Sequence, residues 1–292
     1  MLIFLAAVFI LVILVIIIIY HDMHNFVVRY YDIETDKLKE DRTFCLLSDL
    51  HDNSYGENNI RLVDAIDKVS PDAILVAGDM ITAHHASLNQ NTKPAISLFK
   101  ALADKYLFFI GNGNHEFKIR EYTDLYGDAY DKYLEELKAL NLDIMINEFN
   151  EMPGDNVRVY GLELNYYFFR KLFKNPMDKG YLNKKLGECD KKYFNILIAH
   201  NPIYFDEYVD WGADLIVSGH IHGGIVRLPF IGGIISPTYN LFPKFDGGRF
   251  DNGKQTMILS RGLGTHTIPV RFYNPGELSV IRIHGKGERK KV

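Results

Sequence analysis

The chain is poor in cysteine and has no excess of basic residues. Its 292 residues include two cysteines, Cys45 and Cys189, which are too few for a disulfide framework. The formal net charge is -4, so there is no global basic field and no nucleic-acid partner is expected. The sequence also lacks internal repeats and low-complexity segments. With 47% hydrophobic residues it suits one large globular domain or two small ones, and nothing in the composition points to a protein partner.

Polar side chains are absent from the first 19 residues, MLIFLAAVFILVILVIIII. As a helix this stretch would be about 28 Å long, close to the hydrocarbon thickness of a bilayer. A cleaved signal peptide is the alternative, but it normally has a basic start and a small-residue cleavage site, and this sequence has neither. We therefore predict an uncleaved, single-pass membrane anchor at residues 1–20 and a linker and first strand region at residues 21–40.

Basic residues near the anchor are too few to define its orientation. The nearest one is Arg29, which is offset by Asp22 and Asp32, so the positive-inside rule has little to count. A lone N-terminal anchor that precedes one whole domain often acts as an export signal. We therefore expect the domain to lie on the outer face of the membrane.

Five short apolar runs, each followed by a polar or glycine cluster, dominate the rest of the chain. They are TFCLLSDLH, DAILVAGDM, YLFFIGNGNHE, FNILIAHNP and ADLIVSGHIHGG. Continuous apolar runs of this length are typical of strands covered on both faces. Amphipathic helical patterns such as NNIRLVDAIDKV and AYDKYLEELKAL lie between them, and VRVYGLEL, QTMILSRG and GELSVIRIHG look like further strands. We predict an α/β fold of two packed mixed β-sheets flanked by helices over residues 41–285, with a basic C-terminal tail at residues 286–292.

Each of the five clusters contains Asp, Asn or His at the point where the predicted strand ends. In open α/β sheets, ligands bind beyond the carboxyl ends of the strands. Taken singly, each residue has an ordinary reading, such as a turn cap for Asp49 or a left-handed turn for Asn114. Five repeats of the same placement predict instead a shared metal site. Its candidate residues are Asp49, His51, Asp79, Asn114, His115, His200, His220 and His222.

Carboxylate, amide and imidazole ligands without thiolate favour Mn, Fe or Zn. Eight candidates are too many for one ion that must keep an open position. Two divalent ions about 3.5–4 Å apart, bridged by one carboxylate, would use them. Two such ions bring four positive charges, and two aspartates neutralise only half of them, so the site favours an anionic substrate such as a phosphate ester. A bridging water would become hydroxide near neutral pH.

The ordered set of motifs resembles the calcineurin-like metallophosphoesterases. The family pattern D-x-H, G-D, G-N-H-[DE], H and G-H-x-H stands here as DLH 49–51, GDM 78–80, GNHE 113–116, AH 199–200 and GHIH 219–222. The resemblance covers about residues 41–285 and implies a four-layer sandwich. It also implies two ligand sets that share a bridging Asp79. One set is Asp49, His51, Asp79 and His222, and the other is Asp79, Asn114, His200 and His220.

By the same resemblance, His115 is a catalytic residue rather than a ligand. It would lie near the phosphate and protonate the leaving alkoxide or stabilise the transition state, while Glu116 would have a supporting role. Many family members read G-D-x-x-D, and their second Asp pairs with the catalytic histidine. Here the sequence is GDMIT, so Thr82 stands in that place and the partner of His115 is open.

The C-terminal third is similar to the membrane-associated YkuE-type branch of the family, through GHIHGGIVRLPFIGG and SRGLGTHTIPVRFYNPGEL. Relatives of this branch include enzymes that split the pyrophosphate of UDP-2,3-diacylglucosamine, which implies a phosphodiester or pyrophosphate bond on a lipid-linked or sugar-nucleotide substrate. Candidate substrate-binding residues are Arg227, Arg261, His266 and Arg271, with surface or loop packing as the alternative for each arginine. The stretch NYYFFRKLFK, residues 165–174, is either a membrane-facing element or a segment whose aromatics join the core.

These observations predict a membrane-anchored, metal-dependent phosphoesterase that hydrolyses a phosphodiester or pyrophosphate bond by attack of a dimetal-bound hydroxide. A protein phosphatase or cyclic-nucleotide phosphodiesterase on the same scaffold is an alternative. A nuclease is disfavoured because the chain has no basic excess. From a different class, a non-catalytic, membrane-tethered binding module with a decayed site is the remaining alternative.

Overall fold

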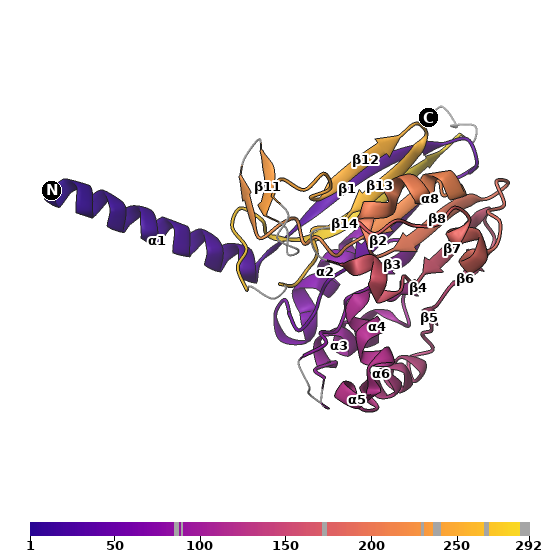
Figure 1. Cartoon of the computed structure of the whole chain (residues 1–292), viewed down its shortest axis with the longest axis horizontal. Coiled ribbons are helices and arrows are strands. Elements are labelled where there is room, and N and C mark those ends of the chain that lie inside the picture. The colour runs from indigo at the N-terminus through magenta and orange to yellow at the C-terminus, as the bar shows by residue number, and fades with distance from the viewer. Residues whose placement is uncertain are drawn as a thin grey trace.

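The computed structural model describes residues 1–84, 88, 90–170, 174–228, 231–235, 241–265 and 269–286. A long N-terminal helix, α1 (Leu2–His24), projects from a layered α/β domain (Figure 1). It has a mean hydropathy of 3.8 over its most apolar 18 residues, none of which is buried against the domain. Among the described residues it is the one helix long and apolar enough to cross a membrane.

Two six-stranded mixed sheets form the centre of the domain. The first sheet has the order β1-β14-β2-β3-β4-β5, with strands at Phe26–Thr35, Gly276–Gly285, Arg42–Leu47, Ala73–Ala77, Leu107–Gly111 and Ile144–Met145. The second has the order β12-β13-β9-β8-β7-β6, with strands at Gly248–Asn252, Gln255–Leu259, Leu215–Ser218, Phe194–Ala199, Val157–Leu162 and Glu148–Glu151. A separate hairpin joins β10 (Val226–Leu228) to β11 (Gly232–Ile235).

Helices cover the outer face of each sheet. Those on the first sheet are α2 (Ile60–Val69), α3 (Lys93–Leu102), α4 (Asn114–Glu121), α5 (Thr123–Tyr126) and α6 (Ala129–Lys138). Those on the second sheet are α7 (Tyr181–Leu186) and α8 (Phe205–Trp211). The layers are thus helix, sheet, sheet and helix, and the predicted α/β fold with two packed mixed sheets is confirmed (Figure 1).

The core follows the two-residue period of the strands. In β3, Leu75 faces the second sheet, whereas Ile74 and Val76 face the helices. The same alternation places Ile196 and Ile198 of β8 in the layer between the sheets, opposite Leu75. All of these side chains are almost fully buried, which explains why the strands read as continuous apolar runs rather than as alternating patterns.

Parallel pairing sets the position of the strand ends. Strands β2, β3 and β4 are mutually parallel in the first sheet, and β7, β8 and β9 are mutually parallel in the second. The loops that follow them therefore leave the same edge of each sheet. Strand β1 pairs in parallel with β14, so residues 26–35 are an integral strand of the first sheet.

We expect Leu75→Ala to lower the free energy of unfolding by about 2–5 kcal/mol, because it would leave a cavity between two packed sheets. Urea unfolding of the full chain in detergent, followed by circular dichroism, measures this change. Leu125→Ala is the matched control, since Leu125 is 48% exposed and its truncation should change stability by less than about 0.5 kcal/mol. Equal losses in the two variants would contradict the packed inter-sheet core.

Candidate metal centre

The structure brings the predicted ligands and the predicted catalytic residue His115 together at one edge of the two sheets. Their positions are the loop after β2 (Asp49, His51), the loop after β3 (Asp79), the start of α4 (Asn114, His115), the end of β8 (His200) and the loop after β9 (His220, His222). The side chains form three groups, and within each group the possible ligand atoms all lie within 4.8 Å of one another. The groups are Asp49, His51 and His222; His51, Asp79 and His115; and Asp79, His200 and His220.

Imidazole nitrogens and carboxylate oxygens face each other at the distances expected of ligands of one ion. The Nε2 atoms of His51 and His222 lie 3.3 Å apart, and His222 Nε2 lies 3.3 Å from Asp49 Oδ1. Ligands about 2.1 Å from a tetrahedral ion would be about 3.4 Å apart. Asp79 Oδ2 lies 3.0 Å from His200 Nε2 and 4.0 Å from His115 Nε2. Asp79 and His51 each belong to two of the three groups, so the groups form one continuous cluster.

Hydrogen bonds to Nδ1 orient three of these histidines. His51 Nδ1 contacts Thr82 Oγ1 at 3.1 Å, His200 Nδ1 contacts the carbonyl of Ala77 at 2.5 Å, and His222 Nδ1 contacts the carbonyl of Gly264 at 3.3 Å. A carbonyl partner requires the proton on Nδ1, which leaves the Nε2 lone pair for a metal. The rings of His200 and His222 are thus held in the tautomer and direction that ligation needs.

Several buried atoms of this cluster have no hydrogen-bond partner. They are Asp79 Oδ2, Asn114 Oδ1 and His200 Nε2. The first and third lie only 3.0 Å apart, yet they do not meet with hydrogen-bond geometry. Leaving buried polar atoms unsatisfied is costly, and a cation held by Asp79 Oδ2 and His200 Nε2 would satisfy both. The donor set and its open atoms therefore fit divalent metal ions.

Backbone strain is concentrated in the same loops. Asp49, His51, Asp79, His220 and His222 all have positive φ angles, between 51° and 75°. Residues other than glycine pay a conformational cost in this region, and such outliers cluster at functional sites. The sharp turns let one loop present two inward-facing ligands, as in Asp49–His51 and His220–His222.

Close packing of the loops requires glycine at two motif positions. A Cβ on Gly113 would lie 2.2 Å from Asp79 Oδ1, and a Cβ on Gly219 would lie 2.3 Å from Asp49 Oδ2. Glu116 then joins the loops after β3 and β4, since its carboxylate accepts hydrogen bonds from the backbone N–H groups of Asp79, Met80, Ile81 and Gly113. Both of its oxygens are occupied, so Glu116 holds the loops rather than the substrate.

Charge pairing within the cluster shifts its pKa values. Burial, with the nearby Asp79 carboxylate, raises the pKa of Asp49 to about 6. Burial alone would lower the pKa of His200, but Asp79 and Asp49 outweigh it and raise the pKa to about 9. Burial alone would raise the pKa of Asp79, but His200 and His115 outweigh it and hold that pKa well below its ordinary value. At neutral pH the ring of His200 is therefore doubly protonated and positively charged when no metal is bound.

The structure supplies the partner of His115 that the altered G-D-x-x-D motif left open. The backbone N–H of Ala83 donates to His115 Nδ1 at 2.8 Å, so a neutral His115 ring carries its proton on Nε2, which points toward Asp79. Thr82 contacts His51 instead. Sequence reasoning could not identify the first contact, because a backbone donor leaves no residue-specific signal.

The candidate substrate-binding residues differ in their surroundings. Arg227 and Arg261 line one cavity of about 510 Å³ beside the hairpin, and Arg227 donates to the carbonyl of Gly223 in the ligand loop. Arg271 is only 3% exposed, and its guanidinium donates to the carbonyls of Arg261, Gly262, Gly264 and Asn274. These contacts hold loops together, which favours the loop-packing alternative for Arg271. His266 lies outside the described residues.

The aromatic stretch at residues 165–174 contributes to the core. Phe168 and Phe169 are 7% exposed and join the cluster beneath the second sheet, and the Phe169 ring lies 5.1 Å from that of His220. Tyr167 is 46% exposed, and Lys174 pairs with Glu207. For the two phenylalanines the core reading is the correct one, and residues 171–173 lie outside the described part.

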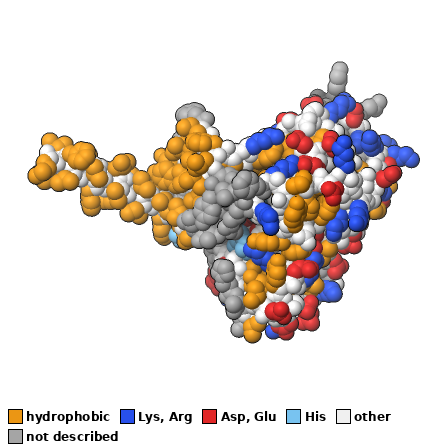
Figure 2. Space-filling model, viewed as in Figure 1, with side chains coloured by type: hydrophobic (Ala, Val, Ile, Leu, Met, Phe, Trp, Pro, Cys, Tyr) orange, Lys and Arg blue, Asp and Glu red, His pale blue; other side chains and the backbone are white. Residues whose placement is uncertain are grey.

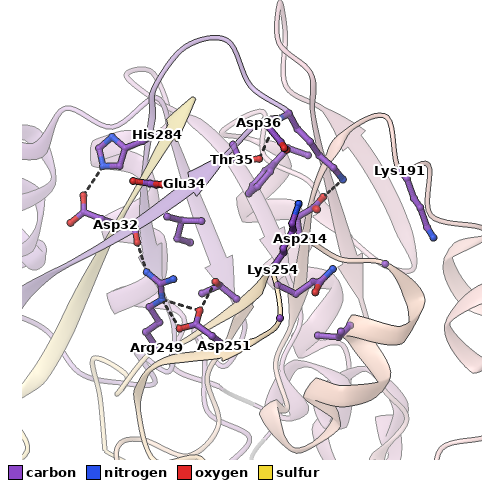
Figure 3. Close-up of a pocket in the computed structure, with 18 of the residues that line it drawn as sticks. Asp32, Glu34, Thr35, Asp36, Lys191, Asp214, Arg249, Asp251, Lys254 and His284 are labelled. Atoms are coloured by element: carbon purple, nitrogen blue, oxygen red, sulfur yellow. Dashed lines mark hydrogen bonds and ion pairs between the residues drawn. The ribbon is translucent and has the colours of Figure 1, made fainter. Parts of the chain in front are cut away.

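A separate cavity of about 1100 Å³ lies at the opposite ends of β8 and β9 (Figure 3). Its charged side chains are largely paired with each other, as in Lys37 with Asp214, Arg249 with Asp251 and His284 with Asp32. None of the predicted site residues lines it. The cavity is therefore unrelated to the cluster of ligands.

The geometry and motifs together define the class of protein. A family model described as calcineurin-like phosphoesterase matches residues 42–224, which is more than half of the chain. The chain therefore belongs to the calcineurin-like phosphoesterase family, as the ordered motifs predicted, and it has residues that can bind metal ions.

Relatives from bacteria and an animal are similar over most of this chain. The uncharacterized metallophosphoesterase YkuE of Bacillus subtilis is 27% identical, over 81% of this chain and 77% of YkuE. A metallophosphoesterase of Caenorhabditis elegans is 28% identical, over 82% of this chain and 48% of that protein. One from Helicobacter pylori is 27% identical, over 87% of this chain and 62% of that protein. The chain thus spans about half of the nematode relative and less than two thirds of the Helicobacter one.

Metal affinity should rise with pH between 6 and 9. Because His200 has a pKa of about 9 in the metal-free chain, a metal must displace its proton below that pH, and each released proton makes affinity change about tenfold per pH unit. Calorimetric titration with Mn²⁺ in buffers of different ionisation enthalpy measures both the affinity and the protons released. An affinity that is constant over this range, with no proton release at pH 7, would contradict the assignment.

Replacement of Thr82 by Val should weaken metal binding about tenfold or more, because the ring of His51 would lose its orienting hydrogen bond. Competition with a chelating dye measures the affinity, and thermal unfolding checks that the fold is intact. Thr92→Val is the control, since Thr92 bonds Glu136 on the surface. Equal affinities in the two variants would show that Thr82 does not orient the ligand.

Proposed function

We propose that the chain is a dinuclear, metal-dependent phosphoesterase that hydrolyses a phosphodiester or pyrophosphate bond. The observation that carries the proposal is the convergence of buried imidazole and carboxylate donors, with Asp79 Oδ2, Asn114 Oδ1 and His200 Nε2 left without hydrogen-bond partners. Seven ligands would hold two ions of Mn, Fe or Zn: Asp49, His51, Asp79, Asn114, His200, His220 and His222. Bound there, such ions would polarise phosphoryl oxygens and lower the pKa of water.

In this proposal His115 stabilises the transition state by donating a hydrogen bond to the leaving-group oxygen. Ala83 N–H holds Nδ1 as an acceptor, so the proton of the neutral ring sits on Nε2. That atom lies 4.0 Å from Asp79 Oδ2, at the side of the ligand cluster. From there the Nε2–H group would donate a hydrogen bond to a departing alkoxide or phosphate oxygen beside the cluster and stabilise its developing charge.

The arginines of the neighbouring cavity would bind the anionic part of the substrate. Arg227 and Arg261 both line it, and a forked guanidinium suits phosphate oxygens. The apolar side of the cavity, formed by Leu228 and Ile231, supports a substrate that joins a phosphate to an apolar group. A lipid-linked substrate and insertion of α1 in a membrane, with the domain on its outer face, are parts of this proposal.

Replacement of His115 by Gln should lower kcat for hydrolysis of bis(p-nitrophenyl) phosphate in Mn²⁺ by about 10²–10³-fold, because the positioned Nε2 donor is lost, with metal content retained. Asp79→Asn should lower both turnover and metal content, because it removes the central carboxylate. His284→Gln, on the surface beside Asp32, is the control and should leave both unchanged. Wild-type turnover in the His115 and Asp79 variants would overturn the proposed function.

A further inference from the structure

The C-terminal end of α1 is fixed to the domain by several contacts. Asp22 is the one buried residue of the helix, at 5% exposure, and its Oδ2 accepts a hydrogen bond from the backbone N–H of Asn274 at 2.8 Å. Gly276 N–H donates to the carbonyl of Asn25, and Arg61 donates to the carbonyl of His24. The helix is thus attached in a defined position rather than through a flexible linker.

Asn274 also holds the loop that carries two of the candidate ligands. Its Nδ2 donates to the carbonyl of His222 at 2.7 Å and to the carbonyl of Gly224 at 2.8 Å. Asn274 therefore forms hydrogen bonds both to the last turns of α1 and to the GHIHGG loop. Because residues 2–19 are wholly apolar and Asp22 is ionisable, Asp22 marks the boundary between membrane and water when the helix is inserted. The ligand loop must then lie close to that boundary.

An exposed apolar surface adjoins this attachment. We define the apolar ribbon as β10, β11 and residues 231, 241–242 and 272–273. Hydrogen bonds join its parts, from Arg227 N–H to the carbonyl of Phe272 and from Phe242 N–H to the carbonyl of Ile234. Five of its large side chains are exposed, namely Leu228 at 38%, Ile231 at 61%, Leu241 at 66%, Phe242 at 64% and Tyr273 at 49%.

The sequence around the ribbon is depleted of charge. Residues 225–243, IVRLPFIGGIISPTYNLFP, contain one charged residue, Arg227, whereas 24% of the whole chain is charged. A solvated segment of this length with the average composition of the chain would carry several charges. Figure 1 places β11 on the side of the domain from which α1 leaves, and Figure 2 shows hydrophobic side chains continuing from α1 onto this part of the domain.

Two aromatics of the ribbon have strained backbones as well as exposed rings. Phe242 and Tyr273 have φ angles of 49° and 52°, in the left-handed region that bulky residues avoid. The strained backbones and the exposed rings both cost free energy in water. Backbone strain of this kind persists where function requires it. Burial of the rings in the interfacial layer of a bilayer, where aromatics are enriched, would remove the cost of exposure.

We propose that the apolar ribbon lies in the interfacial layer of the bilayer that α1 crosses, so that the metal centre opens at the membrane surface. The proposal rests on the membrane insertion that forms part of the proposed function. We take the bilayer to cover the ribbon because the ribbon adjoins the membrane helix. Tyr273 of the ribbon precedes Asn274, whose backbone N–H donates to Asp22 of α1. Arg227 and Arg261, in the cavity beside Leu228 and Tyr273, then lie at headgroup depth.

Quenching of tryptophan by brominated lipid tests the depth of the ribbon. The full chain is reconstituted in vesicles of phosphatidylcholine and phosphatidylglycerol, with or without dibrominated phosphatidylcholine. Phe242→Trp should lose at least half of its added fluorescence in brominated vesicles. Phe149→Trp is the matched control, since Phe149 is 43% exposed on β6, on the opposite side of the domain from α1 (Figure 1), and should not be quenched. The parent chain, with its single tryptophan, gives the baseline.

The proposal would be overturned if the two variants were quenched equally while the chain resisted extraction by alkaline carbonate. That result would favour another cover for the ribbon, such as a second copy of the chain. Release of the chain by carbonate would overturn it together with membrane insertion. Hydrolysis of bis(p-nitrophenyl) phosphate is assayed in the same vesicles. Quenching of Phe242→Trp without hydrolysis would support the docked ribbon and contradict the proposed enzyme, so the two failures are distinguishable.

Discussion

The site depends on the burial of two carboxylates among histidine nitrogens that point at one another. Asp49 and Asp79 are fully buried, and desolvation of a lone carboxylate costs several kcal/mol. In the metal-free chain a proton on His200 offsets part of this cost, as the opposed pKa shifts of His200 and Asp79 show. Divalent ions would offset it more fully, because they would also satisfy the donor atoms that have no hydrogen bond. The glycines, the left-handed turns and the carboxylate of Glu116 all serve to hold this otherwise unfavourable arrangement.

The fold and the convergence of candidate ligands could be predicted from sequence because both follow from strand order. Buried parallel strands read as uninterrupted apolar runs, and a polar residue that ends such a run must lie at the sheet edge. Asp49, Asp79 and His200 were found in this way.

Contacts made through backbone groups were beyond sequence reasoning. The partners of His115 and His200 are the N–H of Ala83 and the carbonyl of Ala77, which any residue could supply. Residue type alone leaves substrate binding and loop packing open for Arg271, whereas its guanidinium contacts carbonyls that only the folded loop brings together. Asn274 passed unnoticed because its importance comes from two distant segments, α1 and the ligand loop.

The central claim is that two metal ions share the cluster around Asp79. Anomalous diffraction from crystals of the full chain grown with Mn²⁺ measures it most directly. The account predicts two peaks about 3.5–4 Å apart, one beside His51 and His222 and the other beside His200 and His220, with Asp79 between them. A single peak elsewhere in the domain, or no peak within reach of Asp79 at saturating Mn²⁺, would contradict it.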